Sequence, residues 1–201
     1  MESAAFLDAA LQNRFNREIL RRLPELALPQ GQLVAGCLFQ TLWNVRSGQA
    51  PEAQIKDYDV FYFDDRDLSY EAEDEVIRAA EALFADLPVD VEVRNQARVH
   101  LWYEAHFGLP CPPLASAREG IDRFLILATC LGVQPFADGT CTLYAPHGCA
   151  DTALGLLRPN PRHDTPHLFE AKAQSYRRRW PWLRVAREEP QKLPKASPGQ
   201  S

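Results

Sequence analysis

Apolar residues recur at two different spacings along this chain, and each spacing predicts one kind of element. Between Phe6 and Leu20 they recur every three or four residues, which predicts an amphipathic helix that ends near Pro24. Ser69 and Gly108 mark boundaries of later helices, since serine caps a helix start and glycine favours a helix end. The later helices are expected at residues 37–46, 69–85, 95–107, a short stretch from 116, and 165–179.

Runs that are wholly apolar, or that alternate between apolar and polar residues, predict five strands. The dipeptide Asp138-Gly139 is a turn signal that joins the last two strands into a hairpin. The strands are expected at residues 32–36, 57–63, 89–93, 125–133 and 140–144. The chain has no internal repeat, and from Glu188 it is rich in Pro, Lys, Ser and Gly. We therefore expect one domain over residues 1–187 and a disordered tail over 188–201.

Composition and charge narrow the classes of function. A chain of 201 residues suits one globular domain, and a net charge of −5 does not favour broad electrostatic capture of nucleic acid. A local basic patch, Arg177–Arg179 beside Trp180 and Trp182, could bind RNA or a phosphorylated acceptor, or could simply place cations at a helix C-terminus. No apolar run is long enough to span a membrane, and the N-terminus lacks the features of a signal peptide, so we expect a cytoplasmic protein.

The five cysteines form no Cys-x-x-Cys pair, which argues against a disulfide framework and against a structural zinc site. His163 and His167 have a spacing seen in metal sites. They lie in a proline-rich segment that is expected to be a loop, however, so ordinary surface histidines are the preferred interpretation.

The segment with the clearest chemical pattern is the predicted strand that begins with Asp57 and Asp59. Alternate side chains of a strand share a face, so the two carboxylates lie side by side, about 7 Å apart. Such like charges repel each other, and a hard divalent cation such as Mg²⁺ would resolve that conflict. The alternative is a solvent-exposed strand start that carries two ordinary acidic residues.

Two neighbouring segments favour the metal interpretation. The helix that follows Gly36 and Cys37 would offer free backbone N–H groups and its positive dipole end to an anion. The strand over 89–93 carries Asp90 and Glu92 on one face, and we prefer Glu92 as a third ligand because it lies closer to the polar run 94–100. Three carboxylates beside a phosphate-type turn predict a site for a metal-bound triphosphate.

With these motifs the chain resembles the nucleotidyltransferase superfamily, and more closely a bacterial family of nucleotidyltransferase-like proteins of undefined substrate. The resemblance spans residues 33 to 182 and rests on the segments 35–44, 57–64, 92–102 and 145–148. It implies an α+β fold, a nucleotidyltransferase-type mixed β-sheet flanked by helices. It also implies a Mg²⁺-dependent NTP site in which Asp57, Asp59 and an acidic residue of the third strand bind the metal.

The chain departs from the superfamily pattern at two points. Position 37 is Cys where Ser or Gly is usual, so only its backbone amide is carried over as a phosphate ligand. The interval from Gly36 to Asp57 is also longer than usual.

Several polar residues remain as candidate nucleotide contacts. Arg94 and Arg98 would lie one helical turn apart and could grip a phosphate, or they could balance nearby acids on the surface. Asn44 is a further candidate within reach of the pocket. His100 and Trp102 could contact a base, although a core position is the more usual role of a helix aromatic.

The predicted function is transfer of a nucleotidyl group from an NTP to an unidentified hydroxyl or phosphate acceptor, with Asp57, Asp59 and Glu92 as catalytic residues. The alternatives are a nucleotide-binding or regulatory protein without turnover, and an RNA-binding module. The sequence does not indicate the oligomeric state.

Overall fold

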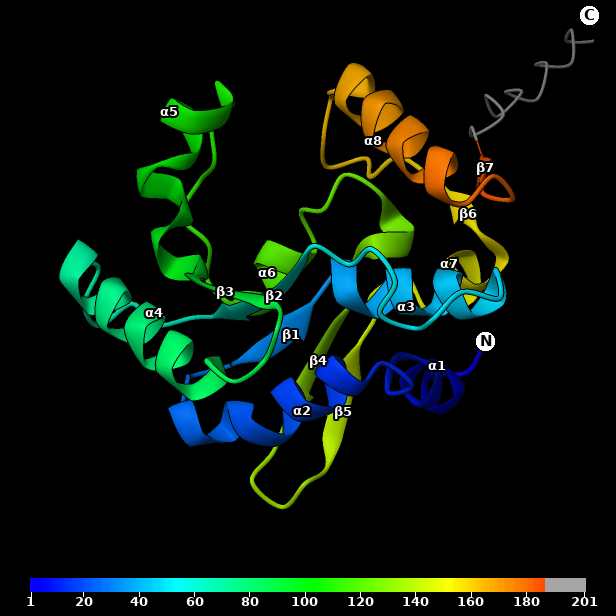
Figure 1. Cartoon of the computed structure of the whole chain (residues 1–201). Coiled ribbons are helices and arrows are strands. Elements are labelled where there is room, and N and C mark those ends of the chain that lie inside the picture. Colours follow the sequence, from blue (N-terminus) through cyan, green and yellow to red (C-terminus); the bar gives the residue numbers. More distant parts are fainter. Residues whose placement is uncertain (187–201) are drawn as a thin grey trace, which may run out of the picture.

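The centre of the computed structural model, which describes residues 1–186, is a five-stranded sheet with the strand order β3-β2-β1-β4-β5 (Figure 1). Strands β2 and β3 are parallel, and the other neighbours are antiparallel, so the sheet is mixed as expected. The strands are β1 (Gln32–Val34), β2 (Asp57–Tyr62), β3 (Asp90–Asn95), β4 (Gly132–Pro135) and β5 (Cys141–Tyr144). The predicted α+β fold is therefore confirmed.

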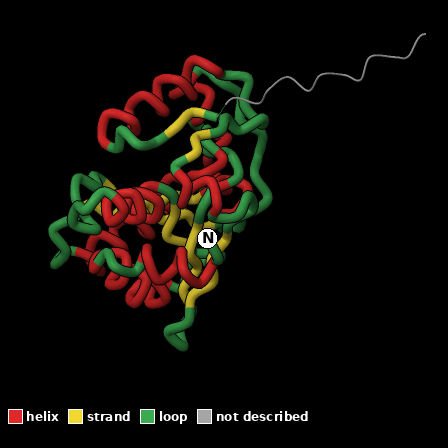
Figure 2. Tube along the Cα trace, turned by 90° about the vertical axis from the view of Figure 1, so that its right-hand side faces the viewer, coloured by secondary structure: helices red, strands yellow, loops and turns green. Residues whose placement is uncertain are grey.

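Helices surround this sheet, and two groups of them extend well beyond its plane. In Figure 1, η2 and α5 form one arm above the sheet, while α8 forms the other. Figure 2 shows α8 again at the top of the molecule after a 90° turn. The helices are α1 (Ser3–Ala10), α2 (Arg14–Arg22), η1 (Leu23–Leu26), α3 (Gly36–Arg46), α4 (Tyr70–Phe84), η2 (Gln96–Leu101), α5 (Tyr103–Phe107), α6 (Ala117–Ile121), η3 (Leu127–Thr129), α7 (Ala150–Leu154) and α8 (Pro166–Arg179).

The two faces of β2 have different neighbours, and this difference creates the site. Tyr58, Val60 and Tyr62 are buried, and Tyr58 packs edge-to-face against Phe15 of α2. The alternate residues of β2 point to the opposite face, where the two arms rise. The buried aromatic side chains therefore fix which face of the strand presents Asp57.

An aromatic cluster holds the α8 arm against α3. The rings of Phe39 and Trp43 on α3 contact Tyr176 of α8, and the Trp43 ring also packs on Trp180, with centroids 4.7 to 5.4 Å apart within the cluster. Trp43 and Trp180 are completely buried. Because edge-to-face aromatic pairs stabilise beyond their buried area, this cluster fixes α8 in place above the sheet.

The prediction of one N-terminal helix is wrong, because the chain breaks between α1 and α2. Asn13 caps α2 by accepting hydrogen bonds from the backbone N–H groups of Phe15 and Asn16. The Asn13 amide also donates to Thr41 Oγ1 and the Tyr58 hydroxyl in the interior. These hydrogen bonds stabilise Asn13 in a non-helical conformation, so the helix is interrupted here. The spacing of apolar residues does not show this interruption.

Two other predicted elements differ in type. The strand expected at 125–133 contains the short η3 helix, and only its end belongs to β4; Thr129 Oγ1 bonds back to the Ile126 carbonyl, which favours the turn. The helix expected at 95–107 is divided into η2 and α5. A small parallel sheet, β6 (Leu156–Leu157) with β7 (Arg184–Val185), was not predicted. The remaining predicted helices and the hairpin at Gly139 are confirmed, with shifts at their ends.

The predicted tail at 188–201 lies outside the described residues, and the single domain over 1–187 stays a prediction. Among the residues that the structure describes, no helix has both the length and the apolar character needed to cross a membrane.

Candidate functional site

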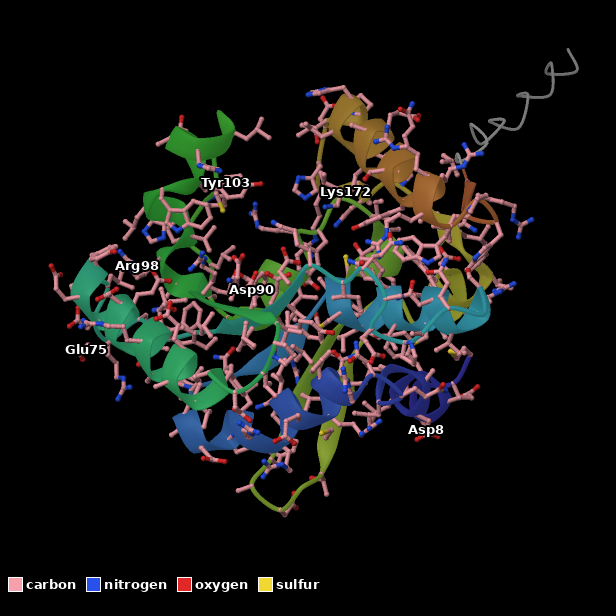
Figure 3. The ribbon with its side chains drawn as sticks, viewed as in Figure 1. Asp8, Glu75, Asp90, Arg98, Tyr103 and Lys172 are labelled. Carbon is pink, nitrogen blue, oxygen red and sulfur yellow. The ribbon has the colours of Figure 1, made fainter. Side chains whose placement is uncertain are left out.

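The candidate site is a cavity of about 830 Å³ between the sheet and the two arms. Its floor carries Asp57, Asp59 and Phe61 of β2, and Gly36 lies at one side, at the start of α3. Figure 3 shows Tyr103 on the α5 arm and Lys172 on the α8 arm, on opposite sides of this space. A volume of this size is typical of small-molecule sites.

The lining combines two acidic residues with more numerous basic ones and several aromatic rings. The charged members are Asp57, Asp59, Lys56, Arg94, Arg123, Lys172 and Arg179. The aromatic members are Phe39, Phe61, Trp102, Tyr103, Phe124 and Tyr176. The formal charge of the lining is therefore positive, with its negative charges confined to the floor.

Four carboxylates, in two directly paired positions, lie on the same face of two adjacent strands. In the parallel ladder, Asp57 is paired with Asp90 and Asp59 with Glu92, so Glu92 is the direct neighbour of Asp59. Burial, followed by the negative charges of Asp57 and Glu92, raises the pKa of Asp59 to about 7. Lys172 and Arg94 lower this pKa, but their positive charges do not cancel the effect of burial.

This donor set fits a hard divalent cation in its chemistry. Within residues 1–186, no three His, Cys, Asp or Glu side chains gather closely enough to hold a metal ion. Asp57 and Asp59 nevertheless share one face beneath the cavity, and the charges of Asp57 and Glu92 add to the effect of burial in raising the pKa of Asp59, without full compensation by Lys172 and Arg94. A bound Mg²⁺ would supply that compensation through oxygen ligands.

Glu92 and Asp90 were both candidates for a third ligand, and the geometry favours Glu92. The charge of Glu92 acts on Asp59, whereas Asp90 lies beside Asp57, farther along an exposed part of β3. Glu92 is also 3.4 Å from the guanidinium of Arg94. Glu92 lines the groove between β3 and α4 rather than the cavity itself.

The turn before α3 has an unusual backbone. Ala35 has φ of 49° and ψ of −111°, a conformation that is common for glycine and strained for other residues. This turn reverses the chain so that α3 begins at Gly36 on the cavity wall. The N-terminus of an 11-residue helix thus opens toward the cavity.

The side chain of Cys37 turns away from the cavity. Its Sγ atom donates to the Val34 carbonyl oxygen, and the residue is completely buried. Burial and the charge of Asp59 raise the pKa of the Cys37 thiol well above its usual value. The thiol is therefore a neutral core group, and only the backbone of residue 37 can serve an anion.

The two predicted arginines have different environments. Arg94 belongs to β3, not to a helix, and it lines the cavity. Arg98 is only 9% exposed, donates to the Leu68 carbonyl, and forms an ion pair with Glu73. Figure 3 places Arg98 toward α4 and away from the cavity. The structure thus places Arg98, predicted as a nucleotide contact, in the interior between η2 and α4 and not among the residues that line the cavity.

Asn44, also predicted as a nucleotide contact, does not line the cavity. Asn44 is completely buried and its side-chain amide is fully used. Its Nδ2 donates to the carbonyl oxygens of Pro51 and Ala53, and its Oδ1 accepts from Trp180 Nε1. This residue joins α3 to the loop before β2 and to the end of α8.

The basic patch at the end of α8 is likewise divided. Trp180 is buried in the core, and Trp182 donates to Ser47 Oγ with its ring under the Arg46 guanidinium. Arg177 and Arg178 remain exposed. Trp180 is therefore not available for stacking beside these arginines, and one face of the Trp182 ring is covered by Arg46.

Residues of α8 that the sequence did not single out complete the cavity. Lys172, Ser175, Tyr176 and Arg179 lie on one face of the helix, at intervals of one, three and four residues, and line the cavity together with Gln40 of α3. The spacing of these residues was visible in the sequence. The sequence did not show that this face of the helix would lie across the cavity from β2. His163 and Trp102 also line the cavity, and Trp102 is 37% exposed.

Comparisons with known proteins identify the family and the fold. No curated protein matches the chain. One solved structure, described as an NMR structure that reveals a CCA-adding enzyme head domain, is similar with a TM-score of 0.66 and 25% sequence identity. The similarity covers 84% of this chain and 87% of that one. A sequence profile described as nucleotidyltransferase matches residues 21–185, from the second helix to the last strand. Since that match covers most of the chain, the protein belongs to the nucleotidyltransferase family.

Proposed function

We propose that this nucleotidyltransferase uses Mg²⁺ to transfer a nucleotidyl group from an NTP to a hydroxyl acceptor. The observation that carries the proposal is the placement of Asp57 and Asp59 on the cavity floor beside the N-terminus of α3. Carboxylates and a helix N-terminus serve opposite needs: the first bind cations and the second binds anions. A metal-bound triphosphate is a ligand that requires both.

Each group has a distinct role in this proposal. Asp57 and Asp59 would hold the metal, with Glu92 beside Asp59 as a third carboxylate. The bound metal would neutralise charge that develops on the reacting phosphate and lower the pKa of the acceptor hydroxyl. The backbone amides of Gly36 and Cys37 would bind the outer phosphates.

The basic side chains support an anionic ligand. Lys172 and Arg94 lie near enough to Asp59 to lower its pKa, so they face the same region as the proposed metal. Arg179 lines the cavity from the end of α8. The basic walls would attract the phosphates, and the acidic floor would repel them. A bound cation would offset that repulsion.

The acceptor would approach from the aromatic side of the cavity, near Trp102 and Tyr103. In-line displacement requires the acceptor to lie opposite the pyrophosphate, and the helix N-terminus defines the pyrophosphate side. The similar solved structure is described as a CCA-adding enzyme head domain, so an RNA 3′ end is one acceptor class to test.

Calorimetry and pyrophosphate release would test the proposal. Wild-type protein should bind an NTP in the presence of Mg²⁺ and release pyrophosphate with a suitable acceptor, such as a pool of cell-extract molecules or RNA 3′ ends. Asp57→Asn should abolish the Mg²⁺-dependent binding while the fold is kept, because it removes one metal ligand. Glu92→Gln should retain most of the binding and lose turnover.

Three outcomes would overturn parts of the proposal. Equal NTP affinities of wild type and Asp57→Asn would refute the metal site. Turnover that is unchanged in Glu92→Gln would move the third carboxylate to Asp90. Tight binding with no pyrophosphate under any acceptor condition would identify a nucleotide-binding protein without turnover.

A further inference from the structure

One side chain on the wall of the cavity has an unused hydrogen-bond donor. Gln40 of α3 lines the cavity, yet it is only 9% exposed. Its Oε1 accepts a hydrogen bond of 2.7 Å from Arg179 Nη1. Within residues 1–186, Gln40 Nε2 donates no hydrogen bond to the protein, and it is not among the fully buried polar atoms. This end of the amide is therefore available to a ligand in the cavity.

Arg179 fixes which end of the amide faces the cavity. A guanidinium has donors and no acceptor, so it can pair only with the oxygen of the glutamine amide. Arg179 is itself held by a hydrogen bond to the Ala53 carbonyl and by its position over the Trp180 ring, 4.1 Å from the centroid. The orientation of Gln40 Nε2 therefore follows from its contact with a fixed cation.

The –NH₂ group of Gln40 lies next to the turn that precedes α3. A Cβ atom added to Gly36 would come within 3.0 Å of Gln40 Nε2, so the –NH₂ group is directly beside the first residue of α3. Residues 36 and 40 are four apart and share one face of the helix. The –NH₂ group and the N-terminal backbone amides of α3 thus point into the same end of the cavity.

The side chain of Cys37 is not available as a donor to an anion at this turn, so the donor of Gln40 is the relevant one. A side chain at position 37 could supply an additional donor to an anion at this turn, but Cys37 Sγ is buried and bonded to the Val34 carbonyl. One helical turn later, Gln40 places a donor over the turn from the cavity side.

We infer that Gln40 Nε2, oriented by Arg179, donates a hydrogen bond to an outer phosphate of a nucleoside triphosphate bound at the N-terminus of α3. This inference rests on the proposed function. Gln40 is a binding residue here, and Arg179 is a positioning residue whose positive charge also favours the anion. The ligand class is a di- or triphosphate group, since the inference concerns phosphates at the N-terminus of α3.

Affinities for NTP, NDP and NMP, measured by calorimetry with Mg²⁺, would test the inference. Gln40→Glu keeps an acceptor for Arg179, removes the donor and adds a negative charge. We expect it to weaken NTP binding about tenfold or more and to change NMP binding less than about twofold. Gln40→Met removes the donor without adding charge, and we expect a smaller loss, about threefold to tenfold, again confined to NDP and NTP.

Gln96→Glu is the matched control, because it adds the same charge to the wall of the same cavity at its other side. It should leave the preference for NTP over NMP intact. Melting temperatures of all variants would verify folding. If Gln40→Met binds NTP as wild type does, or if both Gln40 variants lose NMP equally, the inference is refuted while the proposed function stands. If wild-type protein binds no Mg²⁺–NTP, both are refuted.

Discussion

Asp59 lies directly opposite Glu92 in the parallel ladder between β2 and β3, and of the two only Asp59 lines the cavity. Burial and these like charges raise the pKa of Asp59 to about 7. The metal-free protein therefore carries an electrostatic cost at this position, and the first prediction concerns its pH dependence.

The folded pKa of Asp59 lies above its unfolded value, which is about 3.9. The folded state then binds the proton more tightly, so the stabilising contribution is complete below about pH 4 and is lost as pH rises through 7. Asp59→Asn should raise the free energy of unfolding of the metal-free protein at pH 8 by roughly 2 to 4 kcal/mol. Urea unfolding in EDTA between pH 5 and pH 8 would measure it. Parallel pH profiles for wild type and variant would contradict this assignment.

Replacement by methionine should affect mainly stability at Arg98 and mainly nucleotide binding at Arg94. Arg98 forms a buried ion pair with Glu73, which also accepts from the Asn95 backbone N–H. Removing one partner leaves a buried charge unpaired, so Arg98→Met should lower the free energy of unfolding by about 3 to 5 kcal/mol. Arg94 pairs with Glu92 at the surface, so Arg94→Met should cost less than about 1 kcal/mol and weaken nucleotide binding. Chemical denaturation and calorimetry on both variants would separate these effects, and equal stabilities would exclude the buried pair.

Ala35→Gly should stabilise the protein. The strain of Ala35 at φ of 49° and ψ of −111° is about 1 to 3 kcal/mol, and the greater freedom of glycine in the unfolded chain offsets about 0.5 to 1 kcal/mol of the relief. A net gain of about 1 kcal/mol is expected. Ala80→Gly, within α4, is the matched control and should lose about 1 kcal/mol. Losses in both variants would show that the Ala35 turn is unstrained.

Asn44→Ala should be among the more destabilising single changes in α3. It would leave Trp180 Nε1 and the Pro51 carbonyl oxygen without partners in the interior, and the Ala53 carbonyl oxygen would keep only the hydrogen bond from Arg179. A loss of about 3 kcal/mol or more is expected from thermal or urea unfolding. Folded Asn44→Ala protein should still bind nucleotide at low temperature, since the side chain does not line the cavity. Loss of nucleotide binding with unchanged stability would restore Asn44 as a ligand contact.

Much of the fold and the centre of the site could be predicted from local patterns. The Asp57 and Asp59 pair, the strand that carries Glu92 and the helix start at Gly36 all depend on alternation or on spacing within a few residues. The cap of α4 at Ser69 is also a local signal, and its Oγ atom accepts from the Ala72 backbone N–H.

The features that were missed depend on contacts between distant segments. Asn13 starts a separate helix, with its amide held by Thr41 and Tyr58, and Asn44 is structural because Trp180 lies beside it. Arg98 is buried because Glu73 is there. A sequence shows that such residues are polar, whereas the fold decides whether their partners are protein atoms or a ligand.

The position of α8, across the cavity from β2, also has a consequence for synthesis of the chain. More than a hundred residues separate Asp57 from Lys172, so the acidic floor leaves the ribosome long before the cationic wall exists. A chain released before residue 166 would keep the carboxylates and lack the lysine and arginine that face them. The proposed nucleotide site therefore has its full set of lining charges only in a chain translated through α8.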